Sequence, residues 1–434
     1  MQIGHHQLRI RADARRVVVR PFHLSIDPQG KGPSRARRLI ERVVGLDKDE
    51  VTRELERVYH DFEARHVQVR QVFERRFEQL VDHLDGQVAP LLDQLTPRRR
   101  QLVGAYFCHE YAFAAAAIMN PSVVRHPDDP DDSLSGTRFI MAVRTVGEGH
   151  ISTISFFEGT ADETGAVSID PTPTVATAAD VSRRKSRAAP FEPDRPLAIY
   201  RHPDCGIART VIFPMTGPQS NGIEDLRLTP FVHSTGRREW IGTFTAYDGE
   251  RIRSEILRTA DFRRFDMIPM TGSAARNKGM ALFPRKIDGR YAMIGRQDGE
   301  NLFLLTSDML SHWDEGELLL RPAHAWEFVQ MGNCGPPIEL DEGWLLLTHG
   351  VGAMRRYSIG AVLLDTADPG KVLGRTTLPL LEPLDEERDG YVPNVVYTCG
   401  ALKIGQTLFM PYGIADSSIG FAFFSLPEIL AAMT

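Results

Sequence analysis

Two short stretches of the sequence carry residue types that could bind and protonate a polar substrate. In the first, residues 220–227 (SNGIEDLR), the adjacent carboxylates Glu224 and Asp225 are followed by Arg227. Neighbouring side chains of an extended chain point to opposite faces, so one acid would face a cleft and the other a structural partner. Arg227 would share the side of Asp225 and hold either that acid or a substrate hydroxyl. A surface salt-bridge cluster is the more usual meaning of such a string taken alone.

The second stretch, Arg276-Asn277-Lys278, stands just before an apolar segment that leads into a hairpin. Guanidinium and amide groups at such a place suit an oxyanion such as phosphate. The sequence has no Walker loop, no G-x-G-x-x-G before a helix, no G-x-S-x-G and no H-E-x-x-H, and residues 109–111 (HEY) lack the second histidine. These absences argue against nucleotide binding through those motifs, and against a serine hydrolase or a zinc protease.

The elements that would position these residues are strands. Beyond residue 100, five apolar segments recur, each ending in one or more polar residues: 139–144, 240–248, 291–296, 344–349 and 408–412. Their starts lie 101, 51, 53 and 64 residues apart, and three of these gaps fit a four-stranded propeller blade with generous loops. The wide first gap holds residues 161–180 and the basic run 183–187, which indicate an insertion or long loops. Five repeats predict a five-bladed β-propeller.

If the recurring segments are the inner strands, their terminal polar side chains meet at one mouth of a central channel. These side chains are Arg144, Asp248, Arg296, His349 and Tyr412. Burying an unpaired charge is costly, so this set at matching repeat positions indicates a polar pocket. The alternative is that each residue lies at a blade edge and is satisfied by the neighbouring backbone.

The first hundred residues follow a helical pattern instead. Asp47 followed by Glu50 is typical of a capping box, and the apolar residues behind it recur on one helical face. They form two stripes: Val51, Leu55, Val58 and Phe62, then Val69, Phe73, Phe77, Leu80 and Leu84. We therefore predict a mainly β chain in which residues 1–100 form an α-helical extension of one long helix or two shorter ones, and residues 101–434 form the propeller. The helices would pack on the propeller or on a second copy, which would make a homo-oligomer.

The composition excludes several other classes. The hydrophobic fraction of 42% is ordinary for a globular protein, and a formal charge of −6 gives no global attraction to nucleic acid or anionic lipid. The four cysteines lie far apart without a C-x-x-C pair, which disfavours a disulfide scaffold and a zinc site, so no metal is predicted. No stretch reaches the ~18 apolar residues that span a bilayer, and the start lacks an apolar signal region, so we expect a cytoplasmic location.

Six separated motifs give the sequence a specific resemblance. In chain order they are residues 120–122 (NPS), 224–227 (EDLR), 245–248 (TAYD), 282–291 (LFPRKIDGRY), 335–351 with its GPPI, GW and HGV, and 412–416 (YGIAD). They resemble the successive blade motifs of glycoside hydrolase family 130, the β-mannoside phosphorylases and related β-mannosidases, over roughly residues 105 to 425. Two positions depart from the family pattern: Leu226 replaces a proline, and Arg285 replaces a glutamate.

The resemblance implies a role for each matching residue. Asp225 is implied as the proton donor, acting through a sugar hydroxyl. The mannosyl unit is implied to be held by Asn120, Ser122, Arg144, Arg227, Asp248 and Asp416. Phosphate is implied to be held by Arg276, Asn277, Arg296, His349 and Tyr357.

The resemblance also implies a reaction, the inverting phosphorolysis of β-mannosides, with β-1,2-linked mannooligosaccharides expected. The products would be α-mannose 1-phosphate and a shortened glycan. Phosphate is then a co-substrate and no cofactor is needed, because phosphate is itself the nucleophile and one acid suffices. Two alternatives stay open. An inverting β-mannosidase would need a second carboxylate ~6.5–9.5 Å from the acid, and a non-catalytic carbohydrate-binding propeller would more often use aromatic platforms.

Overall fold

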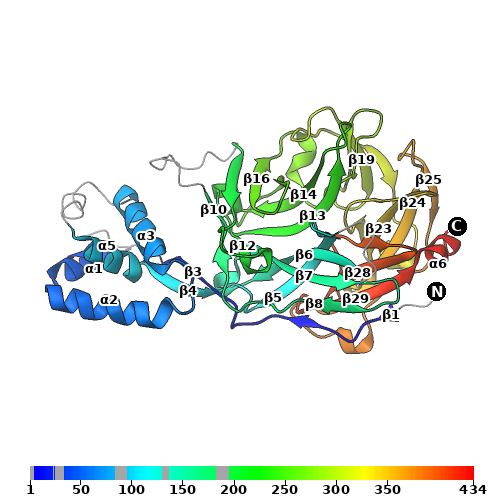
Figure 1. The fold of residues 1–434 in the computed structure, drawn as a ribbon. Helices are drawn as coiled ribbons and strands as arrows, with labels where there is room; N and C mark the ends of the chain where they lie inside the picture. Colours follow the sequence, from blue (N-terminus) through cyan, green and yellow to red (C-terminus); the bar gives the residue numbers. More distant parts are fainter. Residues whose placement is uncertain (1–3, 23, 25–33, 84–94, 130–135, 182–194) are drawn as a thin grey trace.

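A computed structural model describes residues 4–22, 24, 34–83, 95–129, 136–181 and 195–434 of the chain. The predicted positions Leu84 and 183–187 lie outside these residues. The chain is mainly β, and Figure 1 shows a layer of helices that projects from one side of a larger body of strands. The helices of the described part are α1 (Arg35–Gly45), α2 (Lys48–Phe62), α3 (Val69–His83), α5 (Pro97–Tyr106) and the C-terminal α6 (Leu426–Ala431).

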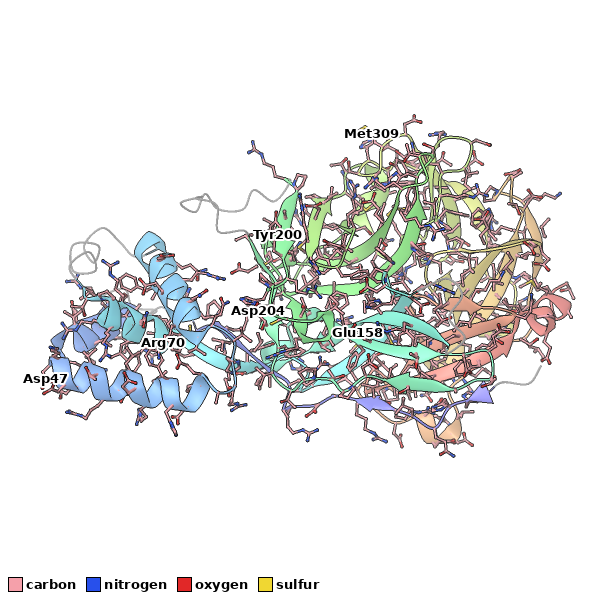
Figure 2. The ribbon with its side chains drawn as sticks, in the orientation of Figure 1. Asp47, Arg70, Glu158, Tyr200, Asp204 and Met309 are labelled. Carbon is pink, nitrogen blue, oxygen red and sulfur yellow. The ribbon has the colours of Figure 1, made fainter. Side chains whose placement is uncertain are left out.

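The capping box at Asp47 is confirmed. The Asp47 carboxylate accepts the Glu50 N–H at 2.8 Å, and the Glu50 carboxylate accepts the Asp47 N–H at 2.8 Å. The two apolar stripes lie on separate helices, α2 and α3, and pack with α1 and α5 in a core of their own. Figure 2 shows Asp47 at the far end of this layer from the strands.

The helical layer meets the body of strands at a few contacts. The β3 (Val17–Pro21) and β4 (Cys108–Ala112) ribbon leads from the helices into the body. Arg75 on α3 forms an ion pair with Asp180, and the Gln68 amide donates to Asp204 at 3.4 Å. Tyr200 and Asp204 lie on the side of the body that faces the helices (Figure 2).

Apart from the β3–β4 ribbon, the strands of the described residues can be divided into five groups, whose neighbouring strands pair antiparallel. The first consists of β5 (Ala117–Arg125), β6 (Thr137–Val146), β7 (Ser152–Ala161) and β8 (Val167–Ile169). The second consists of β13 (Gly222–Val232), β14 (Arg238–Tyr247), β15 (Ile252–Thr259) and β16 (Arg264–Pro269), extended by β11 (Leu197–Tyr200) and β10 (Asp180–Val181). Both belong to one twelve-stranded sheet, together with β12 (Thr210–Ile212) and β9 (Thr177–Ala178).

The third group consists of β17 (Ala281–Leu282), β18 (Tyr291–Gly295), β19 (Leu302–Ser307) and β20 (Glu317–Leu320). The fourth consists of β21 (Gln330–Asn333), β22 (Ile338–Leu340), β23 (Gly343–Val351), β24 (Tyr357–Leu364) and β25 (Val372–Arg375). The fifth consists of β26 (Val396–Tyr397), β27 (Leu402–Ile404), β28 (Thr407–Ile414) and β29 (Ser418–Ser425), completed by the N-terminal β1 (Gly4–His5) and β2 (Ile10–Arg11).

All five recurring segments of the sequence are strands, namely β6, β14, β18, β23 and β28. They pair with β5, β13, β17, β21 and β26, respectively. Tyr412 differs from the expected polar mouth, because it is fully buried in an apolar cluster and its hydroxyl donates to Glu387 at 2.9 Å.

Hydrogen bonds join each strand group, or the loop that leads into it, to the next group and the fifth back to the first. They run from Leu228 N–H to Ser122 Oγ (3.0 Å), from Thr243 Oγ1 to Met280 O, from Met331 N–H to Glu300 O (2.9 Å), from Tyr357 N–H to Asn394 O (3.0 Å), and from Cys399 N–H to Pro121 O (2.7 Å).

Candidate active site

Asp225 sits in a β-bulge of β13, between Glu224 and Arg227. Its backbone is left-handed (φ 56°) and its exposed fraction is 7%. A bulge breaks the alternation of side chains along a strand, so the predicted sharing of one face by Asp225 and Arg227 does not hold. The Arg227 guanidinium donates to the backbone carbonyl of Asp225 at 3.0 Å and to the Tyr397 hydroxyl at 2.9 Å.

The Asp225 carboxylate is held by two side chains from the first strand group. Asn120 Nδ2 donates to Oδ1 at 2.6 Å, and Arg144 Nη1 lies 3.5 Å from the same oxygen. Asn120 also has a left-handed backbone, within a bulge of β5, so two bulged strands face each other here. Arg144 further donates to Glu224 Oε1 at 2.6 Å and thereby bridges both adjacent acids.

These surroundings give three carboxyl groups different pKa values. Burial raises the pKa of Asp225, but the charges of Arg144 and Arg227 outweigh it and hold that pKa at about 2. Burial raises the pKa of Glu224 despite its contact with Arg144. Burial also raises the pKa of Asp416, at the β28–β29 hairpin, to about 6. Asp225 is therefore ionised in the unliganded protein at neutral pH.

A second cluster forms around Gly332 on β21. A Cβ at Gly332 would lie 2.4 Å from His349 Cε1 and 3.3 Å from Arg296 Cδ, so both side chains pack directly on this backbone. The His349 ring stacks on Tyr357 with 5.8 Å between centroids. Burial and the charge of Arg296 hold the pKa of His349 well below its usual value. His349 is therefore a neutral imidazole at neutral pH.

The two clusters are joined through Tyr397. Its hydroxyl accepts from Arg227, and its ring centroid lies 4.8 Å from that of His349. Asp225, Arg227, Tyr397 and His349 thus form a continuous path across the strand groups.

Several buried polar atoms around this path have no hydrogen-bond partner within the described chain: Asn120 Oδ1, Arg227 Nε, His349 Nε2 and both side-chain atoms of Asn333. Buried polar atoms are nearly always hydrogen-bonded, so orphans gathered in one region indicate a site for a polar ligand. Asn333 was not singled out from the sequence. In the sequence, Asn333 is marked only as a polar residue between Gly332 and Cys334, next to the GPPI motif.

Other predicted residues serve the architecture around the site. The Asn277 amide donates to the carbonyls of Arg296 and Gln297 at 2.9 and 3.0 Å and so supports the loop that carries Arg296. Ser122 Oγ accepts the Leu228 N–H that joins β5 to β13.

Two predicted residues are not brought into this cluster. Asp248 Oδ1 accepts the N–H groups of Glu250 and Arg251 at 2.9 and 2.7 Å and so shapes the β14–β15 turn. Arg276 is exposed, and no hydrogen bond or ion pair joins it to Arg296 or His349 among the residues the structure describes.

Comparison with known proteins places this geometry in a family. Residues 207–434, more than half of the chain, match the sequence profile of glycoside hydrolase family 130, described as beta-1,4-mannooligosaccharide phosphorylase. The chain belongs to this family. Among curated relatives, a 1,2-beta-oligomannan phosphorylase of Thermoanaerobacter sp. is 41% identical over 155 residues, and a beta-1,2-mannobiose phosphorylase of Listeria innocua is 34% identical over 229 residues.

The matches cover 35% and 50% of this chain and 52% and 62% of those relatives, so the chain spans about half the length of the curated relatives it matches. The solved structure of a Listeria innocua beta-1,2-mannobiose phosphorylase in complex with beta-1,2-mannobiose has a TM-score of 0.50 at 24% identity. It aligns over 73% of this chain and 92% of its own, and this likeness shows a shared fold.

Within the described residues, no group of three or more His, Cys, Asp or Glu side chains could hold a metal ion. None of the helices in that part is long and apolar enough to cross a membrane.

Proposed function

We propose that this protein is an inverting phosphorylase that cleaves β-mannosides, with inorganic phosphate as the nucleophile. The observation that carries the proposal is the path from Asp225 through Arg227 and Tyr397 to His349, because it puts a carboxyl group and a second polar cluster at the two ends of one site. Arg296 supplies the positive charge at the second end. The relatives named above are phosphorylases of β-1,2-mannosides, so we propose β-1,2-linked mannooligosaccharides as the substrate class.

We further propose that the five strand groups are the blades of a propeller formed by residues 101–434. The hydrogen bonds that run from each group to the next, and from Cys399 back to Pro121, support a closed ring. Residues 1–100 would be a helical extension, which its separate apolar core supports. Homo-oligomer formation through these helices stays a prediction. Most described residues of the apolar stripes are buried within the helical layer and do not support it, whereas Val58 and Phe62 are half-buried.

In the proposed reaction, a phosphate oxygen attacks C1 of the terminal mannosyl unit from the face opposite the glycosidic oxygen. The C1–O bond breaks, the leaving oxygen takes a proton that Asp225 supplies through a sugar hydroxyl, and the products are α-mannose 1-phosphate and the shortened glycan. Asn120, Ser122, Arg144, Arg227 and Asp416 would hold the sugar, and Asn277, Arg296, His349 and Tyr357 the phosphate.

An Asp225 that is ionised before substrates bind must gain its proton with them. A phosphate anion next to Arg296 would offset the positive field around Asp225, and the sugar would displace water from it. Both changes raise the pKa of a carboxyl group. His349 can help to bind phosphate as a neutral side chain, because its unpartnered Nε2 could donate a hydrogen bond to a phosphate oxygen without adding a charge.

The proposal is tested by incubating the protein with β-1,2-mannobiose, with and without phosphate, and assaying mannose 1-phosphate. We expect this product only when phosphate is present. Release of free mannose without phosphate would favour a β-mannosidase, and no turnover of any β-mannoside would favour a binding protein.

The acid assignment is tested by Asp225→Asn. Removing the carboxyl should lower kcat by about a hundredfold or more, while the thermal unfolding midpoint stays close to that of the wild type. Asp266→Asn is the matched control, because among the described residues the Asp266 carboxylate forms its ion pair with the exposed Arg264 on β16, and its loss should leave kcat unchanged. Full activity of Asp225→Asn would overturn the assignment.

A further inference from the structure

Residues 385–394, which we call the rim loop, lie against the hairpin that carries Asp416. The loop contacts three hairpins, β6–β7, β23–β24 and β28–β29. Its bonds are Tyr391 Oη to His150 Nδ1 (3.4 Å), Tyr357 N–H to Asn394 O (3.0 Å) and Val392 N–H to Ala415 O (3.0 Å). The last of these hairpins carries Asp416. A Cβ at Gly390 would lie 2.6 Å from Ala415 Cβ, so the loop backbone is pressed against that hairpin.

The rim loop is anchored from below by Glu387, which is 3% exposed. The Glu387 carboxylate accepts from the Tyr412 hydroxyl at 2.9 Å and from Arg9 at 2.8 Å. Because the buried end of the loop is held by these bonds, its outer end presents Tyr391 at a defined place beside that hairpin.

Folding alone does not explain the side chains at this rim. Tyr391 is 53% exposed and Met354, on the β23–β24 hairpin, is 90% exposed. Met354, Arg355 and His150 all have left-handed backbones, with φ of 57°, 56° and 59°. Met354 and Arg355 are the central residues of the tight β23–β24 turn, and Gly149 and His150 lie in the β6–β7 turn; tight hairpin turns require positive φ at their central residues. The turn geometry explains the backbone, whereas the 90% exposed apolar side chain of Met354 is left at solvent.

The position of the rim loop indicates which part of a substrate would contact it. Asp225 and Asn120 are 7% and 9% exposed, so a sugar that reaches them occupies the inner end of the site. The rest of an oligosaccharide must then lead outward past Asp416 to the rim loop. Aromatic rings line carbohydrate and other ligand sites because they offer a large, rigid apolar face at little entropic cost.

We propose that Tyr391, held by His150, is the platform for the sugar ring on the leaving-group side of the scissile bond. The inference rests on the proposed phosphorylase function and names the part of the substrate that the rim binds. Tyr391 stays attached to the fold through its hydroxyl, so its ring can accept a pyranose without moving. The occupant is the acceptor sugar of the reverse reaction.

The reverse reaction separates the two halves of the substrate. Initial rates are measured with mannose 1-phosphate as donor and β-1,2-mannobiose as acceptor, and the KM of each is determined. Tyr391→Ala should raise the acceptor KM about tenfold, which corresponds to about 1.4 kcal/mol of lost contact. The KM of mannose 1-phosphate should stay within about twofold of the wild-type value, because the donor lies at the inner end of the site.

Two variants complete the test. Tyr391→Phe keeps the ring and should keep the acceptor KM within about twofold. Tyr200→Ala removes another exposed tyrosine (36%), on β11 at the side of the body that faces the helices, and should change neither KM (Figure 2). An unchanged acceptor KM in Tyr391→Ala, or an equal rise of both KM values, would refute the platform. Absence of turnover by the wild-type protein in both directions would instead refute the proposed function, and with it this inference.

Discussion

Replacing Arg144 by methionine tests whether one guanidinium holds two buried acids together. Methionine keeps the apolar stem and removes the donors to Asp225 and Glu224, which lie 3.5 and 2.6 Å from Arg144. In the wild-type protein the pKa of Asp225 is about 2, against an ordinary value of 3.8. A folded-state pKa below the unfolded one stabilises the fold above pH ~4, by about 2 kcal/mol here, and this stabilisation is lost as the pH falls through about 2.

In Arg144→Met that stabilisation disappears, and burial leaves two adjacent carboxylates that resist ionisation. Removing one partner of a buried ion pair costs about 3–5 kcal/mol. We expect Arg144→Met to lower the free energy of unfolding by about 3 kcal/mol at pH 7. This is the lower end of that range, because Arg227 and Asn120 remain beside Asp225. Lowering the pH protonates the stranded acids, so the difference from the wild type should shrink by about 1 kcal/mol or more at pH 5.

The assay is urea unfolding followed by tryptophan fluorescence at pH 7 and pH 5. All four tryptophans (Trp240, Trp313, Trp326 and Trp344) belong to the body of strands, so the signal reports that part. Arg264→Met is the control, because Arg264 pairs with Asp266 at 57% exposure and should cost no more than about 1 kcal/mol at either pH. A difference for Arg144→Met that is equal or larger at pH 5 would show that its cost is one of packing and refute the electrostatic reasoning.

Three further predictions follow from the same contacts. Gly332→Ala should raise the KM of phosphate about tenfold or more, because its methyl group would displace His349. Gly206→Ala is the control, because a Cβ there would have no atom within 4 Å and should leave this KM unchanged. An unchanged phosphate KM in Gly332→Ala would contradict the packing of the second cluster. Arg296→Lys keeps the charge but loses the fork of donors, so phosphate KM should rise about tenfold while mannoside KM does not, and equal changes in both would argue against an anion site. Asp47→Ala should destabilise the helical layer by about 1 kcal/mol in circular dichroism without altering the tryptophan transition, and a shift of both would mean that the two parts unfold together.

The local order of the chain is readable from the sequence because it depends on near neighbours. The capping box at Asp47 needs only two residues three positions apart, and the structure contains it. The five apolar segments became strands because each is long enough to bury one or both faces. The motif residues Asp225, Arg296 and His349 were also singled out from the sequence, and the structure places them along one path.

What the sequence left undetermined depends on contacts between distant segments. The bulge at Asp225 arises from pairing with β14, so the side-chain alternation expected of an extended chain could not reveal it. The neutral state of His349 comes from burial and from Arg296, more than fifty residues earlier. Tyr412 is in the core because Glu387 accepts its hydroxyl there.

Asn333 and Tyr391 are identified as candidate ligand residues only from contacts between segments that are distant in the chain. Asn333 becomes a candidate ligand residue because its amide is buried without a partner beside His349. Tyr391 becomes one because its loop is bonded to hairpins far away in the chain. The sequence by itself determined which segments are helices and strands and which residue types are present to do chemistry. Only the tertiary structure decided which of them meet, since burial and charge act through space and not along the chain.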